Sequence, residues 1–165
     1  MNSLFPLEIE TLARLLLEEA RGRGWRIVTA ESCTGGLVAG ALTDIAGSSD
    51  VVERGFVTYS NRAKSELLDI PGDLIADCGA VSEPVARAMA EGALARSNAH
   101  LSVAITGVAG PGGGSPMKPV GTVHFATAAA NGGIRHREER FGELGRTGIR
   151  LASVQVALEM MRERI

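Results

Sequence analysis

The stretch WRIVTAESCTGGLVAGALTDI, residues 25–45, contains the change of local structure on which the rest of the fold depends. Residues 25–29 are rich in aromatic and β-branched side chains, which is typical of a strand. Gly35 and Gly36 then permit a tight turn. The apolar residues beyond the turn recur with helical spacing: Leu37, Leu42 and Ile45. The stretch therefore predicts a strand, a glycine turn and a helix in direct succession.

The same alternation of strands and helices continues on both sides of this unit. Asn61 is in a position to cap a helix that Pro71 and Gly72 close, and Pro84 after Ser82 is typical of a helix start. Further strands are predicted over 51–59, 100–106, 120–130 and 134–141, and further helices over 7–22, from 61, over 83–97 and through 149–158.

This alternation predicts an α/β fold, a three-layer α/β/α sandwich around a mixed, mostly parallel sheet. Asn131, Gly132 and Gly133 stand between the last two strands and predict a hairpin, which we expect to supply the antiparallel part. We expect residues 1–165 to form a single domain, because 165 residues with 45% hydrophobic content suffice for one continuous core.

Charge and hydropathy exclude several classes of partner. A net charge of -2 and a pI near 5.9 provide no general field that would attract nucleic acid. No apolar stretch approaches the roughly 20 residues of a membrane-spanning helix, and the amino terminus lacks the early positive charges of a secretory signal. We therefore expect a cytoplasmic protein with no membrane partner and no nucleic-acid partner.

Cysteine and histidine spacing gives no sign of a metal site. Cys33 and Cys78 are too few for a disulfide framework and lack the paired spacing of zinc ligands, so we expect reduced thiols. His100, His124 and His136 also lack ligand spacing, and we expect them on strand faces or in loops. The sequence predicts no metal.

Two glycine-rich segments, 30–36 and 106–115, each follow a predicted strand. In open α/β sheets ligands bind beyond the carboxyl ends of strands, where glycine lets the backbone approach and helix amino termini favour anions. Neither segment matches the phosphate loop or the dinucleotide fingerprint. A helix cap at the first segment and a merely flexible loop at the second are the alternatives. Together the segments indicate a site for a small phosphate-bearing ligand.

Several motifs in order carry a family resemblance. They are TAESCTGG (29–36), GFVTYSNRAK (55–64), GAVSEP (79–84), ITGVAGPGGGS (105–115), KPVGTV (118–123) and a final helix that contains arginine. With these motifs the chain resembles the CinA carboxyl-terminal domain family over about residues 8–162. Six motifs in the same order make the resemblance highly specific.

The resemblance implies an amidohydrolase that converts nicotinamide mononucleotide to nicotinic acid mononucleotide and ammonia, in pyridine-nucleotide recycling. It implies a small-molecule nucleotide substrate and no cofactor, and we expect a homo-oligomer of two or more chains. Some members also carry an amino-terminal domain similar to molybdopterin-binding proteins. The 165 residues leave no room for it, so we expect the stand-alone form of the family.

One motif departs from the family pattern. Members typically read F-x-G-D-R before the final helix, whereas residues 141–146 read FGELGR, one residue longer and without the aspartate. The role of this loop is therefore open. Arg146 and Arg150 still fall four apart, on one face of a helix.

We expect Ser32 to be the nucleophile, because its turn exposes the hydroxyl while the N–H groups that follow can accept developing negative charge. Lys64 is the candidate base in a Ser-Lys pair, provided that burial or nearby positive charge lowers its pKa. Tyr59 is a candidate proton donor to the leaving ammonia, or simply a packed side chain. Cys33 at a helix start is an alternative nucleophile, or a packed thiol.

The remaining candidates are substrate contacts, among them Thr106, Ser115 and neighbouring N–H groups for ribose or phosphate. Arg146 is a candidate charge partner, or half of a helix-face salt bridge. Glu31 is interpreted either as orienting Lys64 or as a surface carboxylate. The full predicted binding set is Glu31, Cys33, Thr34, Gly35, Gly36, Thr106, Gly107, Gly110, Gly113, Gly114, Ser115 and Arg146. Lys118 is interpreted as a solvated loop charge, unless the loop closes over phosphate.

Three rival functions stay open. Water could attack the amide directly, with Lys64 and Tyr59 only orienting it. The chain could also be a nucleotide-binding or regulatory module without turnover. A DNA-associated role would rest on a basic stripe over residues 135–140, but alternation with Glu138 and Glu139 on an exposed strand explains that stripe better.

Overall fold

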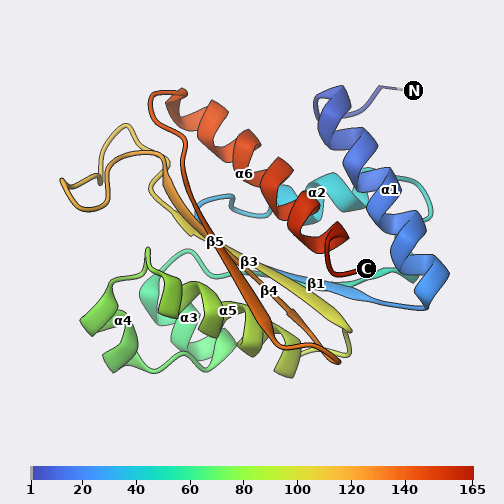
Figure 1. Cartoon of the computed structure of the whole chain (residues 1–165), viewed down its shortest axis with the longest axis horizontal. Coiled ribbons are helices and arrows are strands. Elements are labelled where there is room, and N and C mark those ends of the chain that lie inside the picture. The colour runs from blue at the N-terminus through green and yellow to red at the C-terminus, as the bar shows by residue number, and fades with distance from the viewer. Residues whose placement is uncertain (1) are drawn as a thin grey trace.

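The structure, a computed structural model, describes residues 2–165 and places one five-stranded sheet between two layers of helices (Figure 1). The strands are β1 (Ile27–Glu31), β2 (Val52–Val57), β3 (Leu101–Gly107), β4 (Thr122–Ala129) and β5 (Ile134–Arg140). The helices are α1 (Leu7–Arg23), α2 (Leu37–Thr43), α3 (Asn61–Leu68), α4 (Gly72–Cys78), α5 (Glu83–Ala95) and α6 (Gly145–Arg162), with a short 3-10 turn η1 (Ser48–Asp50) before β2. The predicted α/β sandwich is confirmed.

The sheet order is β2-β1-β3-β4-β5. Strand β1 is parallel to β2 and to β3, whereas β4 is antiparallel to both of its neighbours. Four strands therefore point the same way, and only β4 opposes them. The predicted hairpin between β4 and β5 is present and makes the sheet mixed.

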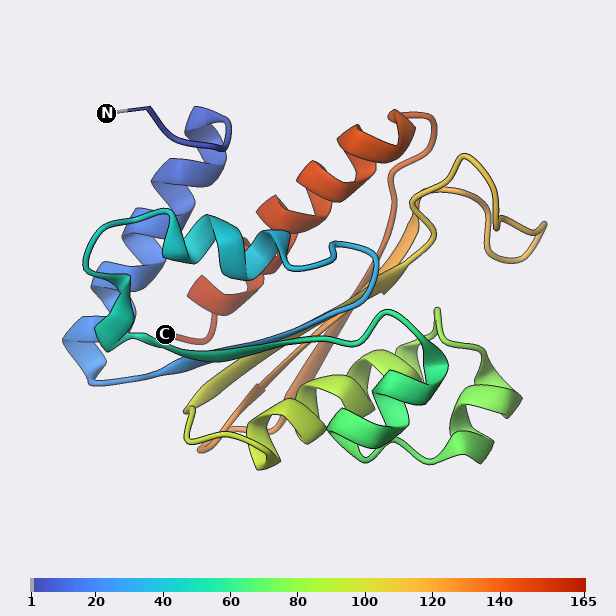
Figure 2. The same ribbon diagram turned by 180° about the vertical axis from the view of Figure 1, so that it is seen from behind.

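Each face of the sheet carries its own core, because successive strand residues point to opposite sides. Helices α1, α2 and α6 cover one face, which Ile27, Val103 and Phe125 enter. Helices α3, α4 and α5 cover the other face, which Val28 and Ala104 enter (Figure 2). The sheet is thus the middle layer of an ordinary three-layer sandwich, with one core on each side of it.

The boundaries of three elements differ from the sequence prediction. Strand β1 begins two residues later than predicted, because Trp25 lies outside the ladder with its ring stacked on that of His100. The helix after β2 ends at Leu68 rather than at Pro71. Pro71 instead is the N-cap residue of α4, a helix of seven residues that the prediction lacked. The apolar pattern of so short a helix is too brief to show a period.

The parallel register brings three strand ends to one edge. Glu31 pairs with Val57 of β2 and with Ile105 of β3. The segments that follow these strands, which contain Ser32, the start of α3 and the glycine loop after β3, therefore leave the sheet side by side. Such an edge is where open α/β sheets bind ligands.

Helix α3 reaches this edge by packing closely against α5. A Cβ atom at Gly92 of α5 would lie 2.2 Å from the carbonyl oxygen of Leu68, the last residue of α3. Only glycine allows this approach, since the atom that it meets belongs to the backbone.

We predict that Gly92→Ala lowers the free energy of unfolding by about 1–3 kcal/mol, because the added methyl group forces α3 and α5 apart. Chemical denaturation measures the change. Gly22→Ala is the matched control, since nothing lies within 4 Å of a Cβ there, and helix propensity predicts stability unchanged or raised by up to about 1 kcal/mol. Equal stability of the two variants would contradict the packing assignment.

Candidate active site

The turn after β1 presents the Ser32 side chain at the sheet edge. Ser32 donates its backbone N–H to Ile105 O at 2.9 Å, and its carbonyl accepts the N–H of Gly35 at 3.0 Å. Gly35 and Gly36 both have positive φ angles, 56° and 102°, which residues other than glycine rarely adopt. Two successive left-handed residues turn the chain from strand into α2 within a few residues.

The carboxylate of Glu31 holds this turn from inside. It is fully buried and accepts hydrogen bonds from Thr34 Oγ1 at 2.7 Å, Val38 N at 2.8 Å and Ala39 N at 3.0 Å. Both alternatives for Glu31, a surface carboxylate and a partner of Lys64, are therefore wrong. A buried carboxylate at the first turn of α2 satisfies free N–H groups and complements the helix dipole.

Lys64 enters the site from the first turns of α3. Ser60 caps this helix by accepting the Ala63 N–H at 3.0 Å, so the predicted cap residue is displaced by one: Asn61 is the first helical residue instead. The side chain of Lys64 is 1% exposed, and its Nζ lies 2.9 Å from Ser32 Oγ. The two residues of the predicted Ser-Lys pair are therefore within hydrogen-bonding distance of each other.

The environment of Lys64 favours the neutral amine. Nζ donates to Thr58 O at 2.8 Å, and among residues 2–165 no carboxylate forms a salt bridge with it. Burial without a counter-ion penalises the charged form, so the pKa of Lys64 lies below its ordinary value. The amine is therefore a stronger candidate proton acceptor than an exposed lysine.

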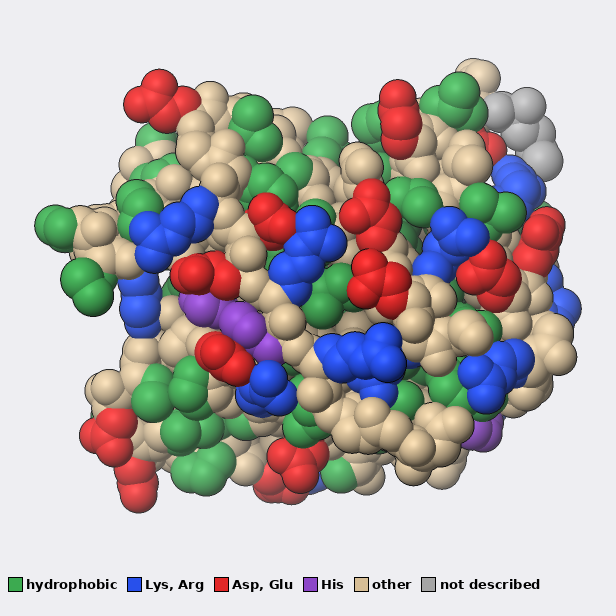
Figure 3. Space-filling model, viewed as in Figure 1, with side chains coloured by type: hydrophobic (Ala, Val, Ile, Leu, Met, Phe, Trp, Pro, Cys, Tyr) green, Lys and Arg blue, Asp and Glu red, His purple; other side chains and the backbone are tan. Residues whose placement is uncertain are grey.

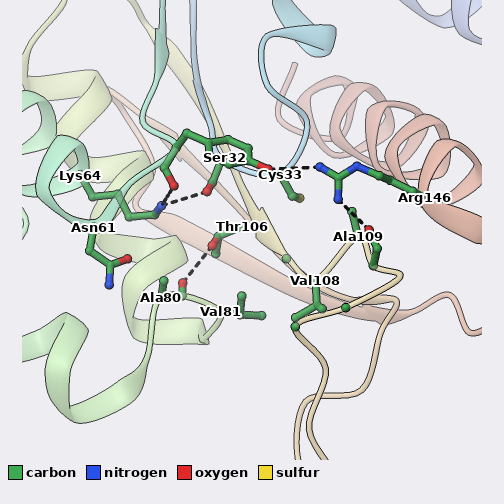
Figure 4. A pocket seen from close by; sticks show the side chains of 15 residues that line it. Ser32, Cys33, Asn61, Lys64, Ala80, Val81, Thr106, Val108, Ala109 and Arg146 are labelled. Carbon is green, nitrogen blue, oxygen red and sulfur yellow. Dashed lines mark hydrogen bonds between the residues drawn. The ribbon is translucent and has the colours of Figure 1, made fainter.

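A pocket of about 310 Å³ opens over the Ser32–Lys64 pair (Figure 4). The predicted residues that line it are Ser32, Cys33, Tyr59, Lys64, Thr106, Gly107, Gly110, Gly113 and Arg146. Those outside the lining are Glu31, Thr34, Gly35, Gly36, Gly114 and Ser115. Arg146 supplies a fixed positive charge, and no acidic residue of 2–165 lines the pocket, so the pocket suits an anionic ligand.

Arg146 joins two sides of the pocket. From the first turn of α6 it donates to Gly110 O at 2.7 Å and to the Tyr59 hydroxyl at 3.1 Å. It is therefore a pocket residue and has no salt-bridge partner among residues 2–165. Because a guanidinium can only donate, Tyr59 accepts this bond and keeps its own hydroxyl proton available.

The altered motif before α6 changes the helix start and leaves the arginine in place. Leu144 occupies the N-cap position and makes no side-chain capping bond, which is the contact that an aspartate typically supplies. The extra residue lies in the loop before the helix, so Arg146 still reaches the pocket.

The end of the glycine loop, at Gly114 and Ser115, makes contacts within the loop itself and does not line the pocket. Ser115 accepts the Lys118 N–H on its hydroxyl at 3.1 Å, and a Cβ at Gly114 would lie 2.9 Å from Val120 N. Lys118 is half-buried and donates to Cys78 O at 2.8 Å. The prediction of a solvated charge at Lys118 is therefore wrong: the lysine fixes the loop to the turn after α4.

Sequence reasoning missed several lining residues. Ala80 and Val81 form one wall, where Thr106 Oγ1 donates to Ala80 O at 2.9 Å, and Asn61 stands beside Lys64. Val108, Ala109 and Gly112 also line the pocket. The motif GAVSEP was a signal for the wall, since it directly precedes the start of α5.

The histidines lie outside the pocket. His124 Nδ1 and His136 Nε2 are 2.9 Å apart on β4 and β5, and burial lowers the pKa of both below the ordinary value. His100 accepts the Arg26 N–H. Within residues 2–165 no group of three or more His, Cys, Asp or Glu side chains is placed to hold a metal ion.

The basic side chains of β5 are interspersed with acidic ones, as on the whole face shown in Figure 3. Arg137 pairs with Glu139 at 2.6 Å and Arg140 with Glu138 at 3.7 Å. The stripe is thus partly neutralised by its own strand. No helix within residues 2–165 has the length and apolar content needed to cross a membrane.

Known proteins share this sequence and fold. A family model described as the CinA C-terminal domain matches residues 9–165. A CinA-like protein of Synechococcus sp. (strain RCC307) is 50% identical over 159 residues, 96% of this chain, and the chain spans 38% of that relative's length. The nicotinamide-nucleotide amidohydrolase PncC of Escherichia coli (strain K12) is 48% identical over 155 residues, 93% of each chain.

A solved structure is similar over the whole chain. The competence/damage inducible protein CihA from Agrobacterium tumefaciens superposes with a TM-score of 0.97 at 57% sequence identity, covering 98% of both chains. The two proteins therefore share the fold.

The thiol of Cys33 is protected by its surroundings. It is 6% exposed, and burial raises its pKa to about 12 despite the nearby charges of Arg150 and Lys64. We predict that Cys33 resists iodoacetamide at pH 8 in the native protein while the partly exposed Cys78 reacts.

Mass spectrometry of the alkylated peptides measures both thiols, and urea-unfolded protein is the control in which both must react. Fast native alkylation of Cys33 would return it to candidacy as a nucleophile.

Proposed function

This chain belongs to the CinA C-terminal domain family, and on that premise we propose that it is an amidohydrolase that deamidates nicotinamide mononucleotide to nicotinic acid mononucleotide and ammonia. One observation carries the proposal: a buried lysine amine, with no carboxylate partner among residues 2–165, stands 2.9 Å from a serine hydroxyl in a pocket that Arg146 also lines. Similarity to the amidohydrolase of Escherichia coli supports the choice of substrate.

The first half of the reaction transfers the acyl group to Ser32. Neutral Lys64 accepts the hydroxyl proton while Oγ attacks the carboxamide carbon. The backbone N–H groups of Cys33 and Thr34, which have no acceptor among residues 2–165, stabilise the oxyanion. The C–N bond then breaks, and the protonated Lys64 returns its proton to the departing ammonia.

The second half releases the acid. Lys64, neutral again, takes a proton from a water molecule that attacks the acyl carbon. The tetrahedral adduct collapses, the bond to Ser32 Oγ breaks, and Lys64 returns the proton to the serine. Nicotinic acid mononucleotide leaves with a new carboxylate.

The rest of the pocket suits the nucleotide part of the substrate. Arg146 and the backbone of the loop after β3 are positioned for phosphate. The Thr106 hydroxyl donates a hydrogen bond to Ala80 O, so its oxygen can accept a hydrogen bond from a ribose hydroxyl. The pyridinium cation of the substrate further lowers the pKa of Lys64 when it binds beside it.

Two alternatives can be distinguished from this mechanism by experiment. Direct attack by water yields the same acid without a covalent Ser32 adduct, and mass spectrometry of the quenched enzyme separates the two routes. A nucleotide-binding module would bind nicotinamide mononucleotide without releasing ammonia. The retained position of Arg146 and the buried Ser32–Lys64 pair favour turnover.

We predict that the purified protein releases nicotinic acid mononucleotide from nicotinamide mononucleotide, detected by liquid chromatography. Ser32→Ala should lower kcat by roughly 10³-fold or more, because the nucleophile is lost. Substrate binding should persist, since most contacts come from other groups. Wild-type turnover in Ser32→Ala would refute the serine mechanism.

The pH dependence should report Lys64. Below its pKa the amine is protonated and cannot accept the serine proton, so kcat/KM should rise with pH and level off at a pKa below the ordinary lysine value of about 10.4. Lys64→Met should remove this limb together with most of the turnover.

Lys64→Arg keeps a positive charge and should be equally inactive, because a guanidinium stays protonated at any working pH. Circular dichroism of each variant verifies folding. An unshifted pH profile in an active Lys64→Met enzyme would exclude lysine as the base.

A further inference from the structure

Arg150 does not line the pocket but bonds the turn that forms part of it. One helical turn after Arg146, its Nε donates to Cys33 O at 3.1 Å and its Nη2 donates to Thr34 O at 3.3 Å. Within residues 2–165 the Cys33 carbonyl has no other donor. A guanidinium can make two such bonds in one plane, which an ammonium cannot.

These bonds fix the direction of the N–H groups on the same turn. The carbonyl of Cys33 and the N–H of Thr34 belong to one trans peptide, so they point in opposite directions. The carbonyl points to α6, in the layer of α1 and α2. The Thr34 N–H therefore points away from α6, toward the side from which α3 brings Lys64.

The same reasoning applies one peptide earlier. The Ser32 carbonyl accepts the Gly35 N–H at 3.0 Å, and the Cys33 N–H of that peptide has no acceptor among residues 2–165. Both peptides thus have a bonded carbonyl and an unbonded N–H. A donor on a carbonyl polarises the peptide and makes its N–H a stronger donor.

We propose that Arg150 is a positioning residue for the reaction: its guanidinium orients and polarises the Cys33–Thr34 peptide so that the N–H groups of the Ser32 turn bind the oxyanion. This rests on the proposed function, since it assumes that Ser32 attacks a carbonyl. It assigns different roles to the two arginines on one face of α6. Arg146 contacts the ligand space, and Arg150 acts through the backbone.

The packing around Arg150 fits this role. A Cβ atom at Gly35 would lie 3.2 Å from Arg150 Nη2, so the glycine leaves room for the guanidinium beside the turn. Arg150 is half-buried, which keeps competing water from its carbonyl bonds. Thr34 O also accepts the Leu37 N–H at 3.0 Å, so the second contact ties the guanidinium to the start of α2.

The test compares Arg150→Met and Arg150→Lys with wild-type protein in steady-state deamidation of nicotinamide mononucleotide. Arg150→Met should lower kcat about ten- to a hundredfold, less than the 10²–10³-fold cost of deleting an oxyanion donor outright. KM should stay within about twofold, because the substrate does not touch Arg150. Arg150→Lys, which can bond one carbonyl at a time, should give an intermediate kcat.

Arg162→Met is the matched control. Arg162 also ties α6 to another element, through its salt bridge to Glu19 of α1, and lies far along the helix from the turn. Arg162→Met should lower the thermal stability of the protein and leave kcat unchanged. A kcat for Arg150→Met equal to that of wild type or of Arg162→Met, or a loss confined to KM, would overturn the proposal.

A substrate-independent measurement separates this inference from the proposed function. A fluorophosphonate probe phosphonylates an activated serine: Ser32 Oγ bonds to phosphorus, fluoride leaves, and Lys64 takes the proton. The phosphoryl oxygen occupies the oxyanion position, so Arg150→Met should slow labelling of Ser32 as it slows kcat. If Arg150→Met slows labelling but the wild-type protein does not deamidate nicotinamide mononucleotide, the role of Arg150 is supported and the proposed substrate is refuted. Undiminished labelling refutes the role of Arg150, and wild-type protein with neither labelling nor turnover refutes both.

Discussion

The burial of one lysine amine against one serine hydroxyl is the constraint around which this structure is arranged. Lys64 is 1% exposed and has no carboxylate partner among residues 2–165, so burial lowers the pKa of its amine. This requires that α3 start at the sheet edge and approach α5 closely, which the Ser60 cap and Gly92 permit. The layer of α3 and α5 thereby places the Lys64 amine beside Ser32.

The opposing layer supplies the complementary half. The Glu31 carboxylate stabilises the Ser32 turn by accepting hydrogen bonds from the Val38 and Ala39 N–H groups in the first turn of α2. Two arginines one helical turn apart on α6 then approach the site from the other side of the sheet edge, one toward the pocket and one toward the turn. The turn thus separates the buried Glu31 carboxylate from the two arginines, and its Cys33 and Thr34 N–H groups have no acceptor among residues 2–165.

The loop after β3 is rich in glycine, yet two contacts hold its backbone in place. Arg146 bonds it at Gly110, and Lys118 bonds it to the turn after α4. These contacts hold the backbone across the pocket from Ser32 without a side chain that would fill the space. This wall of the pocket is thus held by Arg146 of α6 and by Lys118 of the loop itself.

The sequence alone determined the order of the strands and of every helix except α4 and the short η1, the two-sided sheet, the glycine turn and the choice of Ser32 and Lys64 as a pair. Hydrophobic period, caps and turn residues act over a few neighbouring positions and are therefore visible in the chain itself. Only the tertiary structure decided that Glu31 is buried, that Lys118 is bonded, and that Arg150 reaches Cys33 across 117 residues of chain. Such contacts depend on strand order and on the packing of two helix layers, and no local pattern encodes the distance between side chains from different elements.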